Sequence, residues 1–244
     1  MTIQTISGWP PENTVFEVKA FDLSVLPGAH PIYVAHRDEI EENWVRESAA
    51  NPHLFNGQMV LQNRLSFRDG VIIGEAHVIP YSTLLWWRRQ PDPTGAFHLF
   101  GFAVPVSSDG AIIAVRMSER TANPGQVYCA AGSLDLLDIV DGKLDLEANM
   151  RREVREETGL DLADAKADRQ LFACCGGHRV VCFRFYRFDL TAQEMLARIA
   201  DHMVHDEEKE IAGAVAIRSA DRGAHPYSPL MFPILDLFFG HSKG

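Results

Sequence analysis

The sequence predicts a mixed α/β (α+β) fold, in which helices cover a mixed sheet and a smaller α+β region precedes that sheet. Three observations predict this class. The 244 residues are 46% hydrophobic and 23% charged, which is enough apolar material for a sizeable core. Alternating apolar segments typical of strands occur along the chain. Amphipathic segments typical of helices lie between them, without a strict alternation of strand and helix.

The composition excludes several classes of protein. It is not that of a disordered chain, a collagen-like repeat or a coiled coil. With 23 Lys and Arg against 33 Asp and Glu, the net charge is -10, so we expect no nucleic acid partner. No apolar run reaches the roughly 18 residues that span a bilayer, and residues 1–11 carry no secretory signal pattern. We therefore expect a cytoplasmic protein with no membrane partner, whose four cysteines are buried reduced thiols.

The first third of the chain mixes strand and helix patterns. Apolar residues on one side and acids on the other predict a helix that Asn51-Pro52 ends, because a residue before proline avoids the helical conformation. The pair Asp69-Gly70 is typical of a tight hairpin turn. The predicted elements are strands at Phe16–Leu23 and Ile32–Ala35, a helix at Asp38–Ala49, hairpin strands at Gln58–Phe67 and Val71–Ile79, and a short helix at Tyr81–Arg89.

A linker signal follows that short helix. Gln90–Gly95 reads QPDPTG, whose prolines, glycine and aspartate favour turns and offer nothing to a core. We therefore expect an N-terminal α+β region at residues 1–92 and a second domain at residues 96–244. Arg88 and Arg89 lie just before the linker and have two interpretations, as phosphate contacts or as a charged pair flanking the linker.

The second domain is predicted to alternate hairpins with three helices. Ser107-Ser108-Asp109-Gly110 provides another hairpin turn, and Gly159 stands where a left-handed residue ends a helix. Gly176-Gly177 is interpreted as a loop or bulge. The predicted strands are Phe97–Val106, Ala111–Met117, Val127–Ala131, Arg179–Asp189 and Ile211–Ile217, and the predicted helices are Leu144–Thr158, Ala192–His202 and Leu230–Phe239.

The helix at Leu144–Thr158 carries an unusual group of acids. Glu153, Glu156 and Glu157 are spaced i, i+3 and i+4, so their carboxylates share one face and repel each other. Converging carboxylate oxygens are the ligands that Mg²⁺ or Mn²⁺ prefers. The alternative is a solvated charged face, in which Arg152 and its neighbours neutralise the acids.

The string that contains these acids resembles a family motif. Arg152–Leu160 reads REVREETGL and is similar to the second half of the box that defines the Nudix hydrolases. The resemblance implies a mixed sheet sandwiched between helices and metal-dependent cleavage of a nucleoside diphosphate linked to another group. It implies Mg²⁺ or Mn²⁺ ligation by Glu153, Glu156 and Glu157, with Arg152 as a buried orienting residue and Gly132 at the metal site.

The first half of the box departs from the family pattern. Seven residues should separate a Glu from Arg152, but that position holds Leu144. Asp135, Asp145 and Glu147 are the candidates to replace the missing acid. The glycine pair that precedes the box corresponds to Ala131-Gly132, and the extra length after it looks like an insertion at residues 138–143, DIVDGK.

Two further segments bear on function. The only later acid cluster, residues 205–210, precedes the strand at Ile211–Ile217, and we expect Glu210 to face the metal and act in catalysis; a solvated loop is the alternative. Asn51–Gln62 (NPHLFNGQMVLQ), followed by Pro80–Leu85, resembles the N-terminal part of an atypical Nudix branch that includes a uridine diphosphate–glucose hydrolase. The alternative is a cap that only packs on the second domain.

The function expected from these features is hydrolysis of the diphosphate linkage of a nucleoside diphosphate derivative, a nucleotide sugar being one candidate substrate. The partner is thus a small molecule, with a homodimer as an open alternative. A second hypothesis is a Nudix-fold nucleotide-binding or sensor protein that has lost turnover. The missing acid at Leu144 favours the second hypothesis, whereas the three surviving acids favour the enzyme.

Overall fold

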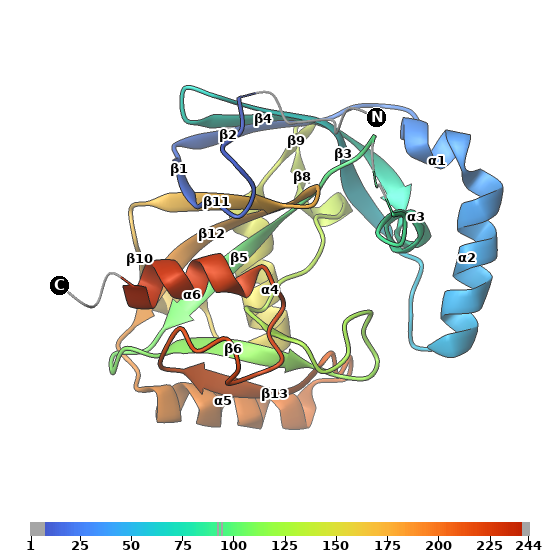
Figure 1. Cartoon of the computed structure of the whole chain (residues 1–244). Coiled ribbons are helices and arrows are strands. Elements are labelled where there is room, and N and C mark those ends of the chain that lie inside the picture. Colours follow the sequence, from blue (N-terminus) through green and yellow to red (C-terminus); the bar gives the residue numbers. More distant parts are fainter. Residues whose placement is uncertain (1–7, 92, 94, 241–244) are drawn as a thin grey trace.

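Two sheets and six α-helices form the computed structural model, which describes residues 8–91, 93 and 95–240 (Figure 1). The mixed α/β class predicted from the sequence is confirmed. The helices are α1 (Pro31–Ala35), α2 (Arg37–Ala50), α3 (Tyr81–Trp87), α4 (Leu146–Thr158), α5 (Ala192–His205) and α6 (Met231–Gly240). The strands are β1 (Phe16–Val18), β2 (Ala20–Val25), β3 (Gln58–Arg68), β4 (Val71–Pro80), β5 (His98–Val106), β6 (Ile112–Met117), β7 (Val127–Tyr128), β8 (Ile139–Val140), β9 (Lys143–Leu144), β10 (Ala165–Ala167), β11 (Leu171–Gly176), β12 (Arg179–Phe188) and β13 (Ile211–Ile217).

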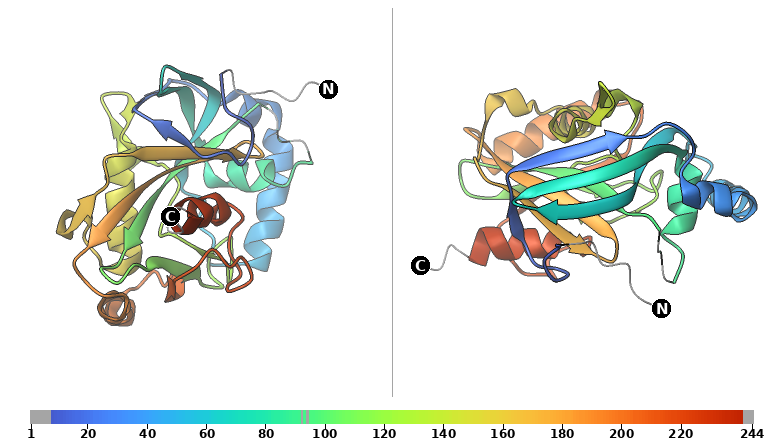
Figure 2. Two further views of the ribbon diagram at one scale, coloured as in Figure 1. Left: turned by 60° about the vertical axis from the view of Figure 1, so that its left-hand side comes forward. Right: turned by 90° about the horizontal axis from the view of Figure 1, so that it is seen from above.

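The larger sheet carries the candidate site. Its strand order is β1-β11-β12-β5-β6-β13, with β10 beside β12 and β7 beside β6. β5 and β12 are parallel and in register from His98 opposite Arg179 to Val106 opposite Arg187, whereas the other neighbouring strands in this sheet are antiparallel. α4 and α6 cover opposite faces of this sheet, as the view from above shows (Figure 2). The predicted sandwich of a mixed sheet between helices is therefore present.

The smaller sheet has the order β3-β4-β2-β9-β8. Its β3–β4 hairpin turns at Asp69 and Gly70, whose φ angles of 53° and 88° belong to the left-handed region that such tight turns need. A second tight turn, at Asp141 (φ 50°) and Gly142 (φ 74°), joins β8 to β9. The segment predicted to be an insertion is thus a hairpin that extends the smaller sheet.

The two halves of the chain share strands and core. β1, from the N-terminal region, pairs with β11 of the larger sheet, and β9, from the second half, pairs with β2 of the smaller one. One apolar cluster includes Leu23 and Ile72 as well as Val104. The predicted linker contains Asp92 and Thr94, which lie outside the described residues, so the boundary at residues 92–96 stays a prediction.

One predicted strand is wrong, and the capping of a short helix explains the error. Ile32–Ala35 lies in the helix α1, because Pro31 occupies its first turn and the His30 side chain accepts a hydrogen bond from the Ile32 amide at 3.1 Å. The sequence pattern also missed β11, which ends at Gly176. Gly177 (φ 57°) and His178 (φ 63°) then form the turn into β12, where a loop or bulge was expected.

The cysteines are as the sequence predicted. All four cysteines are buried and none forms a disulfide. Within the described ranges, no helix has the combination of length and apolar character needed to cross a membrane.

Candidate metal centre and substrate cavity

α4 presents the acids from a helix whose ends are both fixed. The Asp145 side chain caps the first turn by accepting a hydrogen bond from the Ala148 amide at 2.9 Å. Gly159, with φ 68°, ends the helix in the left-handed conformation that the sequence predicted. Met150 packs so closely on β5 that a Cβ at Gly101 would lie 2.7 Å from its side chain, so the helix sits directly on the sheet.

Glu157 is the most deeply buried of the three predicted ligands. One carboxylate oxygen, Oε1, accepts a hydrogen bond from the Ala131 amide at 3.1 Å. The other, Oε2, is buried and has no hydrogen-bond partner among the described residues. Desolvation, followed by the negative charges of Glu153 and Glu210, raises the pKa of Glu157 well above its ordinary value. A buried carboxylate oxygen without a donor is a vacant ligand for a cation.

Glu153 lies against Gly132, the glycine that the resemblance places at the metal site. A Cβ added to Gly132 would lie 2.3 Å from Glu153 Oε2, so a larger residue here would require the carboxylate to shift. Burial raises the pKa of Glu153 to about 8, even though the neighbouring Arg152 charge opposes the shift. The buried Asn149 amide donates to Glu153 Oε1 at 3.3 Å. Glu156 differs from both, because its side chain is 47% exposed.

Arg152 connects the acids into one network. Its guanidinium lies 2.8 Å from Glu153 Oε1 and 3.1 Å from Glu156 Oε2. Its other terminal nitrogen lies 3.1 Å from Asp138 Oδ2 and 3.3 Å from Asp135 Oδ2. Burial alone would lower the pKa of Arg152, but these four carboxylates outweigh it and raise the pKa. The Arg152 side chain is thus mostly buried, and its guanidinium contacts all four carboxylates.

Asp138 pairs with Arg152, which is the contact expected of the glutamate that Leu144 replaces in the resemblance. Its side chain is only 2% exposed, and it accepts hydrogen bonds from Arg152, from the Asn149 amide at 3.0 Å and from the Asp135 backbone at 2.9 Å. Of the three candidates named from the sequence, Asp135 shares this role. Asp145 instead caps α4, and Glu147 pairs with the arginines at 151 and 184.

The spacing rule could not locate Asp138, because the inserted hairpin brings it to the site. Asp135 and Asp138 cap the short 3-10 helix Leu136–Asp138, each side chain accepting a hydrogen bond from that turn's backbone. The β8–β9 hairpin follows directly and returns the chain to α4. The signal in the sequence was Asp141-Gly142, a dipeptide typical of a two-residue hairpin turn.

Glu210 lies at the start of β13 and lines the cavity beside Gly132. Partial desolvation, together with the negative charges of Glu208, Asp206 and Glu156, raises the pKa of Glu210. Its own charge raises the pKa of Glu153 and of Glu157. Among the later acids predicted from the sequence, Glu210 is therefore the one electrostatically coupled to both buried acids of α4.

The carboxylates of α4 do not form a complete metal-binding site. In the part of the chain that the structure describes, no three His, Cys, Asp or Glu side chains converge closely enough to hold a metal ion. Arg152 engages Glu153 and Glu156, while Glu157 Oε2 is vacant. The donor set itself, carboxylate oxygens with a backbone loop at Gly132, fits a hard divalent cation. Such a cation has to draw Glu153 and Glu156 away from Arg152.

A cavity of about 820 Å³ opens beside this centre and is lined by both halves of the chain. Ala131 and Gly132 form part of its wall, and Glu153 and Glu157 contact these two residues from behind. Trp87 contributes to the wall but is itself buried, and the neighbouring Trp86 stacks on His36. These two tryptophans therefore act mainly as core residues. The N-terminal region thus forms one side of the cavity.

Comparison with solved structures identifies similar folds at low sequence identity. They include the MutT protein from Methanosarcina mazei Go1 (16% identity, TM-score 0.39, covering 61% of this chain and 96% of that one). They also include DR0079 from Deinococcus radiodurans (14% identity, TM-score 0.44, covering 74% of this chain and 99% of that one). A third is the Nudix hydrolase RenU from M. smegmatis (12% identity, TM-score 0.37, covering 58% of this chain and 81% of that one). No protein-family model and no curated protein matches the chain. The function is therefore inferred from the residues of the site.

Proposed function

We propose that the chain is a Nudix-type hydrolase that cleaves the diphosphate linkage of a nucleoside diphosphate derivative, with Mg²⁺ or Mn²⁺ as its cofactor. One observation carries the proposal. Glu157 has a buried carboxylate oxygen without a partner, one turn from the buried Glu153 and beside a large cavity. A structural helix gains nothing from burying two carboxylates on one face, since each pays a desolvation cost.

A divalent cation, when bound here, supplies positive charge that neutralises the diphosphate and makes its phosphorus more electrophilic. Glu153, Glu156 and Glu157 offer the carboxylate oxygens that would hold it, and Gly132 offers a backbone carbonyl. Arg152, fixed by Asp138, holds Glu153 and Glu156 in position until they turn to the cation. The raised pKa values of Glu153 and Glu157 mean that cation and proton compete for these oxygens.

Glu210 is the residue we assign as general base. The pKa of Glu210 is raised toward neutral pH, and a carboxylate with such a pKa accepts a proton from water more effectively. In the step we propose, the oxygen of a water forms a bond to one phosphorus of the diphosphate, and the bond from that phosphorus to the bridging oxygen breaks. The water gives up one proton to Glu210, and the leaving phosphate carries away the bridging oxygen.

The test is a panel of nucleoside diphosphate derivatives, nucleotide sugars included, incubated with the protein and Mg²⁺ or with a chelator. The proposal expects phosphate monoester products from at least one substrate, only in the presence of the divalent cation. Tight binding of a nucleotide without any turnover would contradict it and would support the alternative, a nucleotide-binding or sensor protein.

A further inference from the structure

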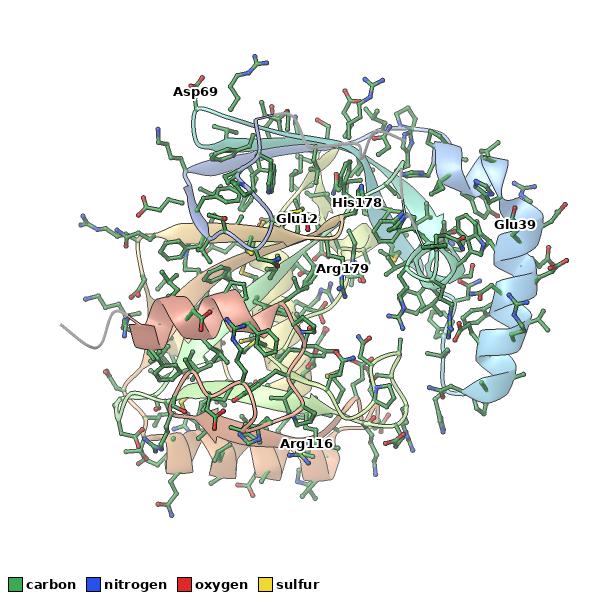
Figure 3. All side chains as sticks on the ribbon, in the orientation of Figure 1. Glu12, Glu39, Asp69, Arg116, His178 and Arg179 are labelled. Carbon is green, nitrogen blue, oxygen red and sulfur yellow. The ribbon has the colours of Figure 1, made fainter. Side chains whose placement is uncertain are left out.

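Within the described residues, three arginines line the cavity. Arg88 follows α3 in the N-terminal region, Arg120 lies in the loop after β6, and Arg179 is the first residue of β12. Figure 3 labels Arg179 beside His178, at the end of the β11–β12 hairpin that points toward α3. Three segments far apart in the sequence therefore bring guanidinium groups to one cavity.

These arginines lack carboxylate partners within the described part of the chain. Arg88 donates to neutral oxygens only, the Ala122 carbonyl at 2.8 Å and Asn123 Oδ1 at 3.3 Å, which fix its guanidinium against the loop after β6. Arg179 forms no ion pair and no side-chain hydrogen bond with any described residue. Glu208, Glu210 and Asp135 line the same cavity, yet none of them lies within 4.0 Å of these guanidinium groups. By contrast, the adjacent Arg89 forms an ion pair with Glu47, outside the cavity.

Arg88 and Arg179 line the same cavity, and the positive charge of one acts on the other. Desolvation and then the charge of Arg88 lower the pKa of Arg179. Desolvation, followed by the charges of Arg179 and Arg88, lowers the pKa of His98 to about 3, so that its ring is neutral at pH 7. Both arginines are exposed to solvent, and an anion that binds between them would relieve their mutual repulsion. Among the described residues, no carboxylate of the cavity forms an ion pair with either arginine, so a ligand can supply the anion that binds both of them.

We propose that Arg88 and Arg179 together form a clamp that binds a phosphate group of the substrate in the cavity beside the carboxylates of α4. Planar guanidinium forks match the oxygens of a phosphate, which has negative charge to share between two of them. The identity of the ligand rests on the proposed function, because the substrate proposed there carries two phosphates. The N-terminal region then binds substrate through Arg88, rather than only covering the second domain.

Inorganic pyrophosphate is the probe that tests this clamp. We expect calorimetric titration without a divalent cation to give a Kd at least tenfold higher for Arg179→Gln and for Arg88→Gln than for the natural protein. Arg179→Lys should recover part of the loss, because it keeps the charge but not the fork. The matched control is Arg169→Gln, which removes the same charge from an exposed residue outside the cavity, and its Kd should stay within twofold.

Stability provides an independent check on the variants. Arg179 has no partner to lose among the described residues, so Arg179→Gln should melt no lower than the natural protein. Any weaker binding then reflects the lost contact. Unchanged pyrophosphate affinity in both Gln variants would overturn the clamp, as would equal losses in Arg169→Gln or no binding by the natural protein.

The proposed function can fail separately from the clamp. Arg179→Gln leaves the acids of α4 untouched, so Mg²⁺ should raise its melting temperature as much as it raises that of the natural protein. If the natural protein shows neither a Mg²⁺ shift nor hydrolysis, the enzyme proposal fails, while arginine-dependent pyrophosphate binding would still support the clamp.

Discussion

Replacing Asp138 with Asn tests whether this residue has taken over from the missing glutamate of the box. The substitution keeps the side-chain volume but removes the charge and one acceptor oxygen. Asp138 Oδ2 accepts three hydrogen bonds, and Oδ1 lies 3.3 Å from the same Arg152 nitrogen. In Asp138→Asn, the amide nitrogen would replace one of these two oxygens and would face a hydrogen-bond donor, which it cannot accept from.

The expected cost follows from these contacts. Removing one partner of a buried ion pair costs about 3–5 kcal/mol when nothing replaces it. Arg152 keeps Asp135, Glu153 and Glu156, and burial already raises the pKa of Asp138, which means that its charge is expensive to bury. We therefore expect a loss of about 2 kcal/mol, which corresponds to a melting temperature roughly 4–8 °C lower for a chain of this size.

The assay is thermal unfolding of Asp138→Asn beside two controls from the other sequence-based candidates. Asp145→Asn should cost less than about 0.5 kcal/mol, because Asn caps a helix as well as Asp does. Glu147→Gln breaks only half-exposed ion pairs, which are worth about 0–1 kcal/mol. If Asp138→Asn melts like the natural protein while Asp145→Asn or Glu147→Gln does not, the assignment of Asp138 is refuted.

Two further predictions concern Gly132 and His30. Gly132→Ala places a Cβ 2.3 Å from Glu153 Oε2, so we expect the free energy of unfolding to fall by about 1–3 kcal/mol and Mg²⁺ to raise the melting temperature by less. The control is Gly240→Ala, whose Cβ would meet nothing within 4 Å, and equal stability of both variants would contradict the close approach. His30 is fully buried, and desolvation lowers its pKa to about 4. Because unfolding lets His30 bind a proton near its ordinary pKa of 6.5, its contribution is complete above pH 6.5 and is lost as the pH falls toward 4. This loss amounts to about 3 kcal/mol, and denaturant unfolding at several pH values should show it as a steeper decline for the natural protein than for His30→Gln. Parallel pH profiles would refute the role of His30.

Much of the second half was predictable from the sequence, because its elements are long and their ends carry strong local signals. The helix with Glu153, Glu156 and Glu157 was located within two residues, since its apolar side and Gly159 agree. The strand β13 was predicted with the same bounds that the structure has.

The remaining features depend on contacts between distant segments. Asp138, which contacts Arg152, lies directly before a hairpin of the second half that pairs with β2 of the first half. Likewise, Arg88 was interpretable from the sequence as a phosphate contact or a charged pair, and only the fold brings it near Arg179. Ile32–Ala35 has residues typical of a strand, but the cap at His30 and the proline that follows it favour a helix.

The central claim is that the acids of α4 hold a divalent cation for hydrolysis, and Glu157→Gln tests it most directly. This change removes the carboxylate that has a vacant oxygen, while keeping the shape and leaving an oxygen for the Ala131 amide. The measurement is the Mg²⁺-dependent rate of hydrolysis of the best substrate from the panel, with Glu147→Gln, which lies on the same helix, as the control. The account predicts a loss of at least a hundredfold in Glu157→Gln and less than threefold in Glu147→Gln, because a metal ligand stabilises charge in the transition state. Full activity of Glu157→Gln would contradict the account, and the acids of α4 would then be part of a charged helix without a metal.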